Sequence, residues 1–451
     1  MKDPAETEAP GDSSLLELLL ETRNLPLDAR TRRFAAFLRT TKAARENLYF
    51  REIEGPAGRE VCVRDPFTGL SRQMLMFGSN NYLDLAADPY VRERVVEAIE
   101  RFGTGVGGPP MLNGFTSQLR NLEERLAAFK GAEAAIVFPS GYQTNLGLVD
   151  ALMDRGDLVL YDESHHASIY DGLKLSKAGR RSFPHNDVGA LEALLEKRRP
   201  DARDAFVCVE SVYSMDGDLS PLPAILKACR AHNAHLVVDD AHGTGVLGDT
   251  GRGAAEHYGL EGQIDLTMGT FSKALAGVGG FVTGPTRVID YLRYFARSYM
   301  FSAAIPPAAL AMVLAALDVL EREPERVARL RANVAYLAQG LRDLGFDVTA
   351  RSAILPLFVP HGMKIRKAAY AFQQAGIFLN AIEWPAVPPD RQRFRISLMT
   401  SHTRDDLDRL LEVIQAVWSD PKLRESGEDP PTSGTRSAAS RARRVSRSGG
   451  A

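Results

Sequence analysis

The feature that most constrains the fold is an alternation of short β-rich runs with helical patterns in the middle of the chain. The runs expected to form strands are Ala134–Phe138, Asp157–Tyr161, Ala205–Glu210, His235–Asp239, Leu266–Gly269 and Gly280–Thr283. Helical patterns such as Val188–Lys197 and Leu222–Ala231 separate several of them. Because strand–helix alternation builds βαβ units, the pattern predicts an α/β fold with a mostly parallel sheet covered by helices on both faces.

The pattern changes around Pro306 and Pro307, where a long helical region begins. We therefore expect a large α/β domain over residues 95–300 and a smaller α+β domain over residues 301–420, with residues 48–94 joining the small domain. In the small domain the sequence predicts helices at Leu310–Leu320, Arg326–Leu344 and Arg404–Val417, and strands at Leu355–Val359 and Phe394–Leu398.

The two ends differ from this body in composition. Residues 1–47 form an N-terminal extension in which residues 14–22, with five leucines after a capping serine, predict a short helix. We expect that helix to pack on the parent domain, with a membrane-surface or partner helix as the alternative. Residues 421–451 are rich in Ser, Arg, Pro and Gly and predict a disordered basic tail.

Charge and cysteine usage narrow the class of protein. The 451 residues include 55 Lys and Arg against 57 Asp and Glu, a net charge of −2, which gives no footprint for nucleic acid. Cys62, Cys208 and Cys229 are single and widely spaced, which is typical of a reducing compartment and unlike a metal site. No apolar run is long enough to span a membrane, and the first residues lack a signal-peptide pattern. A cytoplasmic enzyme is the expectation.

The first candidate for chemistry is Lys273, in the run Gly269-Thr-Phe-Ser-Lys273 that follows a predicted buried strand. A lysine among small residues at such a place is unusual, and desolvation would make its amine nucleophilic. That property suits a Schiff base with pyridoxal phosphate, while Thr270 and Ser272 offer hydroxyl groups to a phosphate. A lysine on an ordinary surface loop is the alternative.

Other polar residues follow further predicted strands. Asp239 ends one strand and His242 follows it; a carboxylate there can hold a pyridinium nitrogen protonated. The pair His165-His166 follows another strand, and without metal-ligand spacing around it an imidazole stacked on an aromatic cofactor is an alternative to a metal ligand. The turn Pro139–Asn145 has backbone amides that could hold phosphate. Taken singly, Asp239 is better explained as a carboxylate that caps a loop.

Taken in order, these segments resemble the α-oxoamine synthases, pyridoxal-phosphate enzymes with the fold-type I aminotransferase architecture. The resemblance covers about residues 48–418. Its motifs are Phe77-Gly-Ser-Asn80-Asn-Tyr-Leu83, Leu112-Asn-Gly114, His166-Ala-Ser-Ile-Tyr-Asp-Gly172, Ser214-Met-Asp-Gly-Asp218, Asp239-Asp-Ala-His-Gly-Thr-Gly245, Gly269-Thr-Phe-Ser-Lys273 and Phe301-Ser-Ala-Ala-Ile-Pro-Pro307.

The resemblance implies a decarboxylative condensation of an α-amino acid with an acyl thioester, and it implies roles for individual residues. Lys273 would bind the cofactor covalently and move the α-proton, Asp239 would bind the pyridine nitrogen, and His166 would stack on the ring. His242 and Ser214 would bind the ring oxygen. The phosphate would be held by Thr270, Ser272 and the backbone of Gly141 and Tyr142, with Ser302 added from a partner subunit. Asn80 and Arg395 would face the substrate carboxylate, and the enzyme would be a homodimer with active sites at the interface.

Bacterial serine palmitoyltransferases, which use serine and a long-chain acyl-CoA, are the group most resembled. An 8-amino-7-oxononanoate synthase using alanine and a pimeloyl thioester, a glycine C-acetyltransferase-like enzyme and a polyketide-associated enzyme with a carrier-bound acyl chain stay open. So do an aminotransferase and a silent partner subunit. The sequence departs from the family at Pro109-Pro110 and at Glu383, where several members have an arginine near the amino-acid carboxylate.

Overall fold

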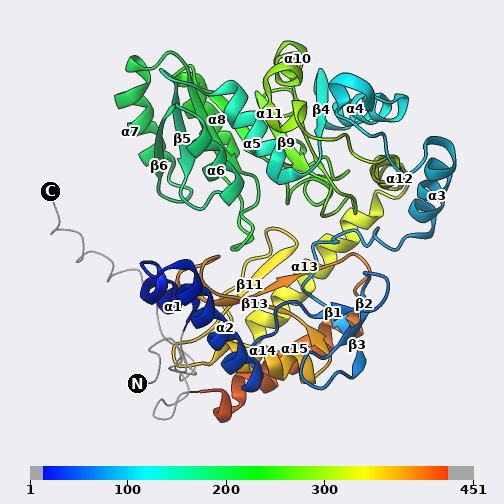
Figure 1. Cartoon of the computed structure of the whole chain (residues 1–451), viewed down its shortest axis with the longest axis vertical. Helices are drawn as coiled ribbons and strands as arrows, with labels where there is room; N and C mark the ends of the chain where they lie inside the picture. The colour runs from blue at the N-terminus through cyan, green and yellow to red at the C-terminus, as the bar shows by residue number, and fades with distance from the viewer. Residues whose placement is uncertain (1–13, 425–451) are drawn as a thin grey trace.

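The structure is a computed structural model that describes residues 14–424, and a seven-stranded sheet organises its larger part (Figure 1). The strand order is β4-β10-β9-β8-β7-β5-β6. Neighbouring strands pair in parallel from β9 to β6, whereas β10 runs antiparallel to both β4 and β9. The strands are β4 (Ala134–Phe138), β5 (Leu158–Asp162), β6 (Gly179–Phe183), β7 (Ala205–Glu210), β8 (His235–Asp239), β9 (Leu266–Thr270) and β10 (Gly280–Gly284).

Both faces of this sheet are covered, because alternate residues of its strands belong to two different hydrophobic clusters. In β7, Val207 and Val209 pack on one side, while Phe206 and Cys208 pack on the other. The covering helices come from the same part of the chain. They are α4 (Ser117–Lys130), α5 (Gly141–Leu152), α6 (Ala167–Leu175), α7 (Val188–Arg198), α8 (Leu222–Ala231), α9 (Ala254–Tyr258), α10 (Thr286–Phe295) and α11 (Arg297–Met300). The predicted fold class, a mostly parallel sheet with helices on both faces, is confirmed.

A second body, in the lower half of Figure 1, combines the two ends of the described chain. It contains the sheet β11-β14-β13 and a second sheet in which β12 pairs in parallel with β3, so strands from both ends of the described chain share one sheet. The strands are β1 (Glu52–Ile53), β2 (Glu60–Arg64), β3 (Ser71–Met76), β11 (Ile354–Phe358), β12 (Ile377–Phe378), β13 (Asn380–Ile382) and β14 (Arg393–Ser397). The helices α3 (Pro89–Phe102), α12 (Pro307–Arg322) and α13 (Glu325–Asp343) connect the bodies, and α14 (Ile365–Gln374) and α15 (Arg404–Ser419) complete the lower one.

The N-terminal extension forms α1 (Leu15–Thr22) and α2 (Leu27–Ala43). Ser14 caps α1, as the sequence predicts, and Glu17 completes a reciprocal capping box with it. Leu18 is buried against Phe37 of α2, and the guanidinium of Arg366 lies over the Phe37 ring. The extension therefore packs on the small domain, although Leu19 and Leu20 stay exposed.

Two sequence predictions differ from the structure. The predicted tail begins at residue 421, but Pro421–Leu423 forms a 3-10 helix because buried Leu423 packs on the domain and its carbonyl accepts from the Lys364 N–H. The rest of the predicted tail, from residue 425, lies outside the described residues, as do residues 1–13. Strand β6 was not predicted, since its residues are mostly polar. In residues 14–424 no helix is long and apolar enough to cross a membrane.

Candidate active site

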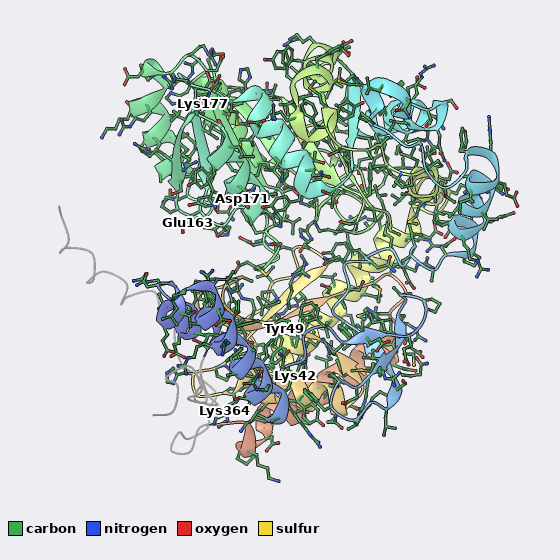
Figure 2. The ribbon with its side chains drawn as sticks, in the orientation of Figure 1. Lys42, Tyr49, Glu163, Asp171, Lys177 and Lys364 are labelled. Atoms are coloured by element: carbon green, nitrogen blue, oxygen red, sulfur yellow. The ribbon has the colours of Figure 1, made fainter. Side chains whose placement is uncertain are left out.

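The polar residues singled out in the sequence converge at the carboxyl edge of the central sheet. Asp162, Glu210 and Asp239 end the adjacent strands β5, β7 and β8, and Lys273 follows β9. Ligands bind at this edge of parallel sheets. Glu163 and Asp171, both labelled in Figure 2, lie on the side of the large domain that faces the small one. The candidate site is therefore between the two bodies.

Lys273 lies half-buried on the loop between β9 and β10. Burial lowers the pKa of its amine, and the nearby charge of Arg395 acts in the same direction, while Asp239 and Glu210 oppose the shift. A larger fraction of the amine is therefore neutral than for a surface lysine. This is the reactive lysine environment that the sequence predicts.

Asp239 and its neighbour Asp240 point to different surroundings. The Asp239 carboxylate accepts from the side chain of Asn145 at 2.8 Å and from the Ala241 N–H at 3.0 Å. Asp240 is instead paired with Lys130 at 2.7 Å in a buried ion pair. Since a charge partner already occupies Asp240, Asp239 is the carboxylate of the two that faces the site.

His166 caps the N-terminus of α6, where its Nδ1 lies 2.7 Å from the Ser168 hydroxyl. Desolvation lowers the pKa of His166, and its ring meets that of Tyr142 edge-on at 6.3 Å between centroids. His165 is fully buried with no hydrogen bond to either ring nitrogen, and burial lowers its pKa to about 4. In residues 14–424 no group of three or more His, Cys, Asp or Glu side chains could hold a metal ion.

Beneath His166 lies Glu210, a fully buried carboxyl group that sequence reasoning missed. Its carboxyl interacts with the backbone N–H groups of His166 and Ser214, and its strand position pairs with Asp239. Burial and the charge of Asp239 raise its pKa well above the usual range. Glu210 therefore links the backbone of two residues, His166 and Ser214, that are predicted to contact the cofactor.

A cradle for an anion forms where the N-terminus of α5 meets Thr270. A Cβ atom on Gly141 would lie 2.7 Å from the Thr270 hydroxyl, and one on Gly280 would lie 2.8 Å from the Gly141 Cα. The hydroxyls of Thr270 and Ser272 are 3.0 Å apart. Because the first N–H groups of a helix lack partners inside it, those of Gly141 and Tyr142 are available to a phosphate.

Ser302 lies beside this cradle within the same chain, since its hydroxyl accepts from the Gln143 side chain at 3.1 Å. The sequence resemblance assigned Ser302 to the cofactor of a partner subunit. That assignment stays a prediction, and the described chain places Ser302 next to its own α5.

His242, Tyr82, Asn80 and Arg395 form one hydrogen-bonded group on the small-domain side. The Tyr82 hydroxyl lies 2.7 Å from His242 Nδ1 and donates to Asn80 at 3.1 Å. Arg395 Nη1 donates to Asn80 at 2.9 Å, and its Nη2 donates to Tyr82 at 3.3 Å. Burial, with the charges of Lys273 and Arg395, lowers the pKa of His242 well below the usual range, so this ring is neutral.

Arg395 is buried, yet within the described residues its hydrogen bonds go only to neutral acceptors. Besides Asn80 and Tyr82, these are the Ser214 carbonyl at 2.5 Å and the Ser397 hydroxyl at 3.0 Å. Arg393, two positions earlier on β14, pairs with Asp216 at 2.7 Å. Unlike Arg393, Arg395 therefore makes no ion pair within residues 14–424, and its role toward a substrate carboxylate stays a prediction.

The two departures from the family pattern have local explanations. Glu383 is buried and ion-paired with Arg366 at 3.0 Å, so its charge is neutralised away from Arg395. Pro110 begins a short π-helix, Pro110–Gly114, whose Gly114 packs too closely against Ala304 to carry a side chain.

Sequence reasoning missed Tyr82, Asn145 and Glu210, each of which interacts with predicted site residues. Tyr82 and Asn145 lie inside motifs that the sequence analysis singled out. Their hydrogen bonds to His242 and Asp239 could not be read from the sequence. Glu210 ends a predicted strand, as Asp239 does, and that shared position was the available signal.

The residues present fit pyridoxal phosphate. A side chain at Gly141 would clash with Thr270, so the glycine leaves space for a phosphate. Asp239 accepts from Asn145, and the pKa of the half-buried Lys273 amine is lowered. On this strand order they define a fold-type I pyridoxal-phosphate transferase, and the cofactor is pyridoxal 5'-phosphate.

Comparison with known proteins places the chain more closely. Residues 72–414 match the family described as aminotransferase class I and II, and the chain belongs to that family. It is 41% identical over 376 residues to a serine palmitoyltransferase of Sphingobacterium spiritivorum. This match covers 83% of the present chain and 92% of the relative. It is also 41% identical to an 8-amino-7-oxononanoate synthase of Geobacter sulfurreducens, over 82% of this chain and 95% of the relative.

A solved structure agrees with these relatives. The serine palmitoyltransferase from S. paucimobilis, solved with a PLP–myriocin aldimine bound, superimposes with a TM-score of 0.82 at 32% identity. The match covers 87% of this chain and 98% of that one. The resemblance to α-oxoamine synthases is therefore confirmed, and the chain is a pyridoxal-phosphate enzyme of that type.

Proposed function

We propose that the protein joins an α-amino acid to an acyl thioester with loss of CO2, releasing a thiol carrier and an α-amino ketone. The substrates that we propose first are L-serine and a long-chain acyl-CoA, as in serine palmitoyltransferase. The observation that carries the proposal is buried Arg395, held by Asn80 and Tyr82 with no acidic partner in residues 14–424. A guanidinium in this state is suited to bind a carboxylate through two parallel hydrogen bonds.

The surrounding side chains supply the other functions that this reaction needs. When bound, pyridoxal phosphate supplies an electron-withdrawing ring that stabilises a carbanion. Asp239 would hold the charge on the ring nitrogen, and the cradle at Gly141, Tyr142, Thr270 and Ser272 would fix the phosphate. The lowered pKa of Lys273 increases the fraction of its Nζ able to accept a proton.

The remaining contacts are assigned by position. His166 would stack on the ring from the N-terminus of α6, and His242 and Ser214 would bind the ring oxygen. Ser302 would add a phosphate contact across a homodimer interface. A dimer with the active sites at its interface is consistent with the exposed side chains of Leu112 and Phe301 near Ser302.

We further propose a cytoplasmic location, supported by three free cysteines at Cys62, Cys208 and Cys229. A second candidate for the location is the membrane surface, with contact through the exposed Leu19 and Leu20 of α1, because a long-chain acyl substrate partitions into bilayers. Nucleic acid is not an expected partner.

The test is a thiol-release assay with the purified protein loaded with pyridoxal phosphate. Serine, alanine and glycine are each paired with palmitoyl-CoA, pimeloyl-CoA and acetyl-CoA, and with one acyl chain on a carrier protein. Release of CoA with serine and palmitoyl-CoA supports the first choice, while alanine with pimeloyl-CoA supports the 8-amino-7-oxononanoate synthase alternative.

Transfer of the amino group to a 2-oxo acid without thiol release would overturn the proposal in favour of an aminotransferase. Absence of every reaction in a protein that binds the cofactor would favour a silent subunit. Lys273 is the second check: borohydride reduction should attach the cofactor there, and a label on another residue would contradict the site.

A further inference from the structure

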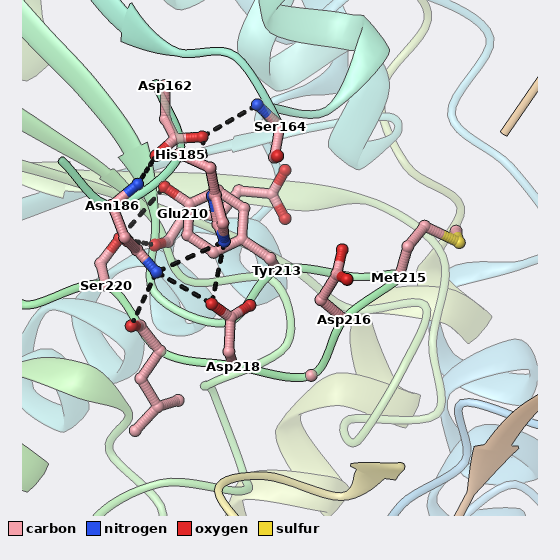
Figure 3. A network of polar contacts seen from close by, with 12 residues as sticks. Asp162, Ser164, His185, Asn186, Glu210, Tyr213, Met215, Asp216, Asp218 and Ser220 are labelled. Carbon is pink, nitrogen blue, oxygen red and sulfur yellow. Dashed lines mark hydrogen bonds and ion pairs between the residues drawn. The ribbon is translucent and has the colours of Figure 1, made fainter. Parts of the chain in front are cut away.

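A half-buried histidine outside the group of predicted contacts, His185, joins three segments around the site (Figure 3). It follows β6, at the same carboxyl edge of the sheet as Asp162 of β5. His185 Nδ1 lies 3.0 Å from Asp162 Oδ1, and its Nε2 lies 2.9 Å from Asp218 Oδ2. Because a carboxylate only accepts, both ring nitrogens donate, and the ring is an imidazolium between two acids.

On one side this contact fixes the turn that leads to His166. Asp162 also accepts from the backbone N–H groups of Ser164 and Asn186, each at 2.8 Å. Its own carbonyl accepts from the His165 N–H at 3.1 Å. The carboxylate that binds His185 thus sets the course of the backbone into the histidine pair.

On the other side the contact fixes the loop that carries Ser214. Asp218 closes this loop, since its carbonyl accepts from the Tyr213 N–H at 3.0 Å. The His185 ring meets the Tyr213 ring edge-on at 4.4 Å, and Asn186 donates to the Asp218 carboxylate at 2.9 Å. The loop in turn offers the Ser214 carbonyl to Arg395.

We propose that His185 is a positioning residue, which through Asp162 and Asp218 holds the two loops bearing His166 and Ser214 at the spacing that the cofactor ring needs. The inference rests on the proposed roles of His166 and Ser214. The neighbouring charges support this role, because the carboxylates of Asp162 and Asp218 both face the His185 ring. Glu163 accepts weakly from the backbone N–H of His185, and the other neighbours, Tyr213 and Asn186, are neutral. The two acids raise the pKa of His185 to about 10 despite partial burial, so the imidazolium persists at neutral pH.

The test compares His185→Asn with a matched histidine at the opposite edge of the same sheet. His235 begins β8 and lies 3.9 Å from Asp204 and 3.7 Å from Asp265, so His235→Asn also removes a histidine between two acids. Each full-length variant is freed of cofactor and titrated with pyridoxal phosphate. Affinity and the circular dichroism induced in the cofactor are measured, and the melting temperature is recorded separately.

We expect His185→Asn to weaken cofactor binding by about tenfold or more, as is typical when a group that orients a ligand-contacting side chain is removed. The induced circular dichroism should fall as well, while His235→Asn leaves both unchanged. Asp218→Asn should reproduce the effect, and the double variant should add little to it, because the two residues act through one contact.

Equal cofactor affinity in wild type and His185→Asn, an equal loss in His235→Asn, or fully additive effects in the double variant would overturn the inference. If His185→Asn does not fold, Asp218→Asn decides the question alone, since it keeps the bond to Asp162. The proposed function fails differently, by absence of thiol release in a wild type that binds the cofactor.

Discussion

At the scale of single residues, neighbouring residues of the same charge lie in different environments. Asp239 and Asp240 follow one another at the end of β8, yet one faces the site and the other is neutralised by Lys130 beneath it. The same division separates Arg395, which has only neutral partners in the described chain, from Arg393, which is paired with Asp216. The sequence shows both members of each pair next to the predicted site. Only tertiary packing determines which member is left without an ion-pair partner in the described chain.

We expect Asp240→Asn to lower the free energy of unfolding and Asp239→Asn to lower the catalytic turnover. Breaking a buried ion pair by removing one partner costs about 3–5 kcal/mol, so urea unfolding of Asp240→Asn should show a loss of that order. Asp239→Asn should keep cofactor and stability but lose a few powers of ten in turnover, at roughly tenfold per 1.36 kcal/mol. Near-normal turnover in Asp239→Asn would show that another group holds the ring nitrogen.

Arg395→Lys should raise the KM for the amino acid far more than the KM for the acyl thioester. A lysine is a point charge and cannot form the two parallel hydrogen bonds that a guanidinium makes with a carboxylate. Steady-state kinetics with each substrate varied in turn measure the two constants. Equal effects on both substrates, or none, would show that other groups, with Asn80 the first to test, hold the carboxylate.

At the scale of elements, strands with apolar cores were predictable and polar ones were not. Residues 134–138, 205–210 and 235–239 form strands at the predicted bounds, because burial on both faces leaves a continuous apolar run. In β6 only Phe183 is buried, and β12 is two residues long, so neither has a local pattern to detect. Lys273, Asp239 and His166 could be singled out because they follow apolar strands, whereas Asn80, Ser214 and Ser302 rested on the family resemblance. The directions of Tyr82 and Glu210 depend on tertiary packing.

The junction of α5 with β9 and β10 gives a prediction at this scale. Gly141→Ala should weaken cofactor binding, because the new Cβ would displace Thr270 and the first N–H groups of α5. Losing one hydrogen bond to a charged group costs about 1.5–3 kcal/mol, or roughly ten- to a hundredfold in Kd. Gly105→Ala, at a glycine with open space around it, is the control in the same titration. Equal affinities in the two variants would contradict a phosphate cradle at Gly141.

At the scale of the whole molecule, the loop between Tyr213 and Asp218 joins the two bodies. Arg393 and Arg395 reach it from β14, the Ser352 hydroxyl donates to the Gly217 carbonyl, and His185 holds it from the large domain. A Cβ on Gly217 would lie 2.3 Å from the Ile354 carbonyl oxygen, so the backbone itself forms the contact. The relative placement of the bodies therefore depends on charged groups as well as on apolar packing.

The stability gained from His185 should decrease with rising pH. Its folded pKa, about 10, exceeds the usual 6.5, so its contribution is complete below about pH 6.5 and is lost as the pH rises toward 10. The check is the difference in unfolding free energy between wild type and His185→Asn, measured in urea at about pH 6, 8 and 10. A difference that stays constant or grows toward alkaline pH would contradict the imidazolium assignment.

The parallel pairing of β12 with β3 has a consequence for synthesis on the ribosome. All seven strands of the central sheet lie within residues 134–284, so the large domain can fold as soon as that stretch has emerged. Strand β3 is made earlier, but its partner Ile377 follows Leu75 by about 300 residues, a separation that makes the pairing slow. Strands β1, β2 and β3 can pair with one another early, but the β3 edge that binds β12 stays unpaired through most of translation and must not aggregate.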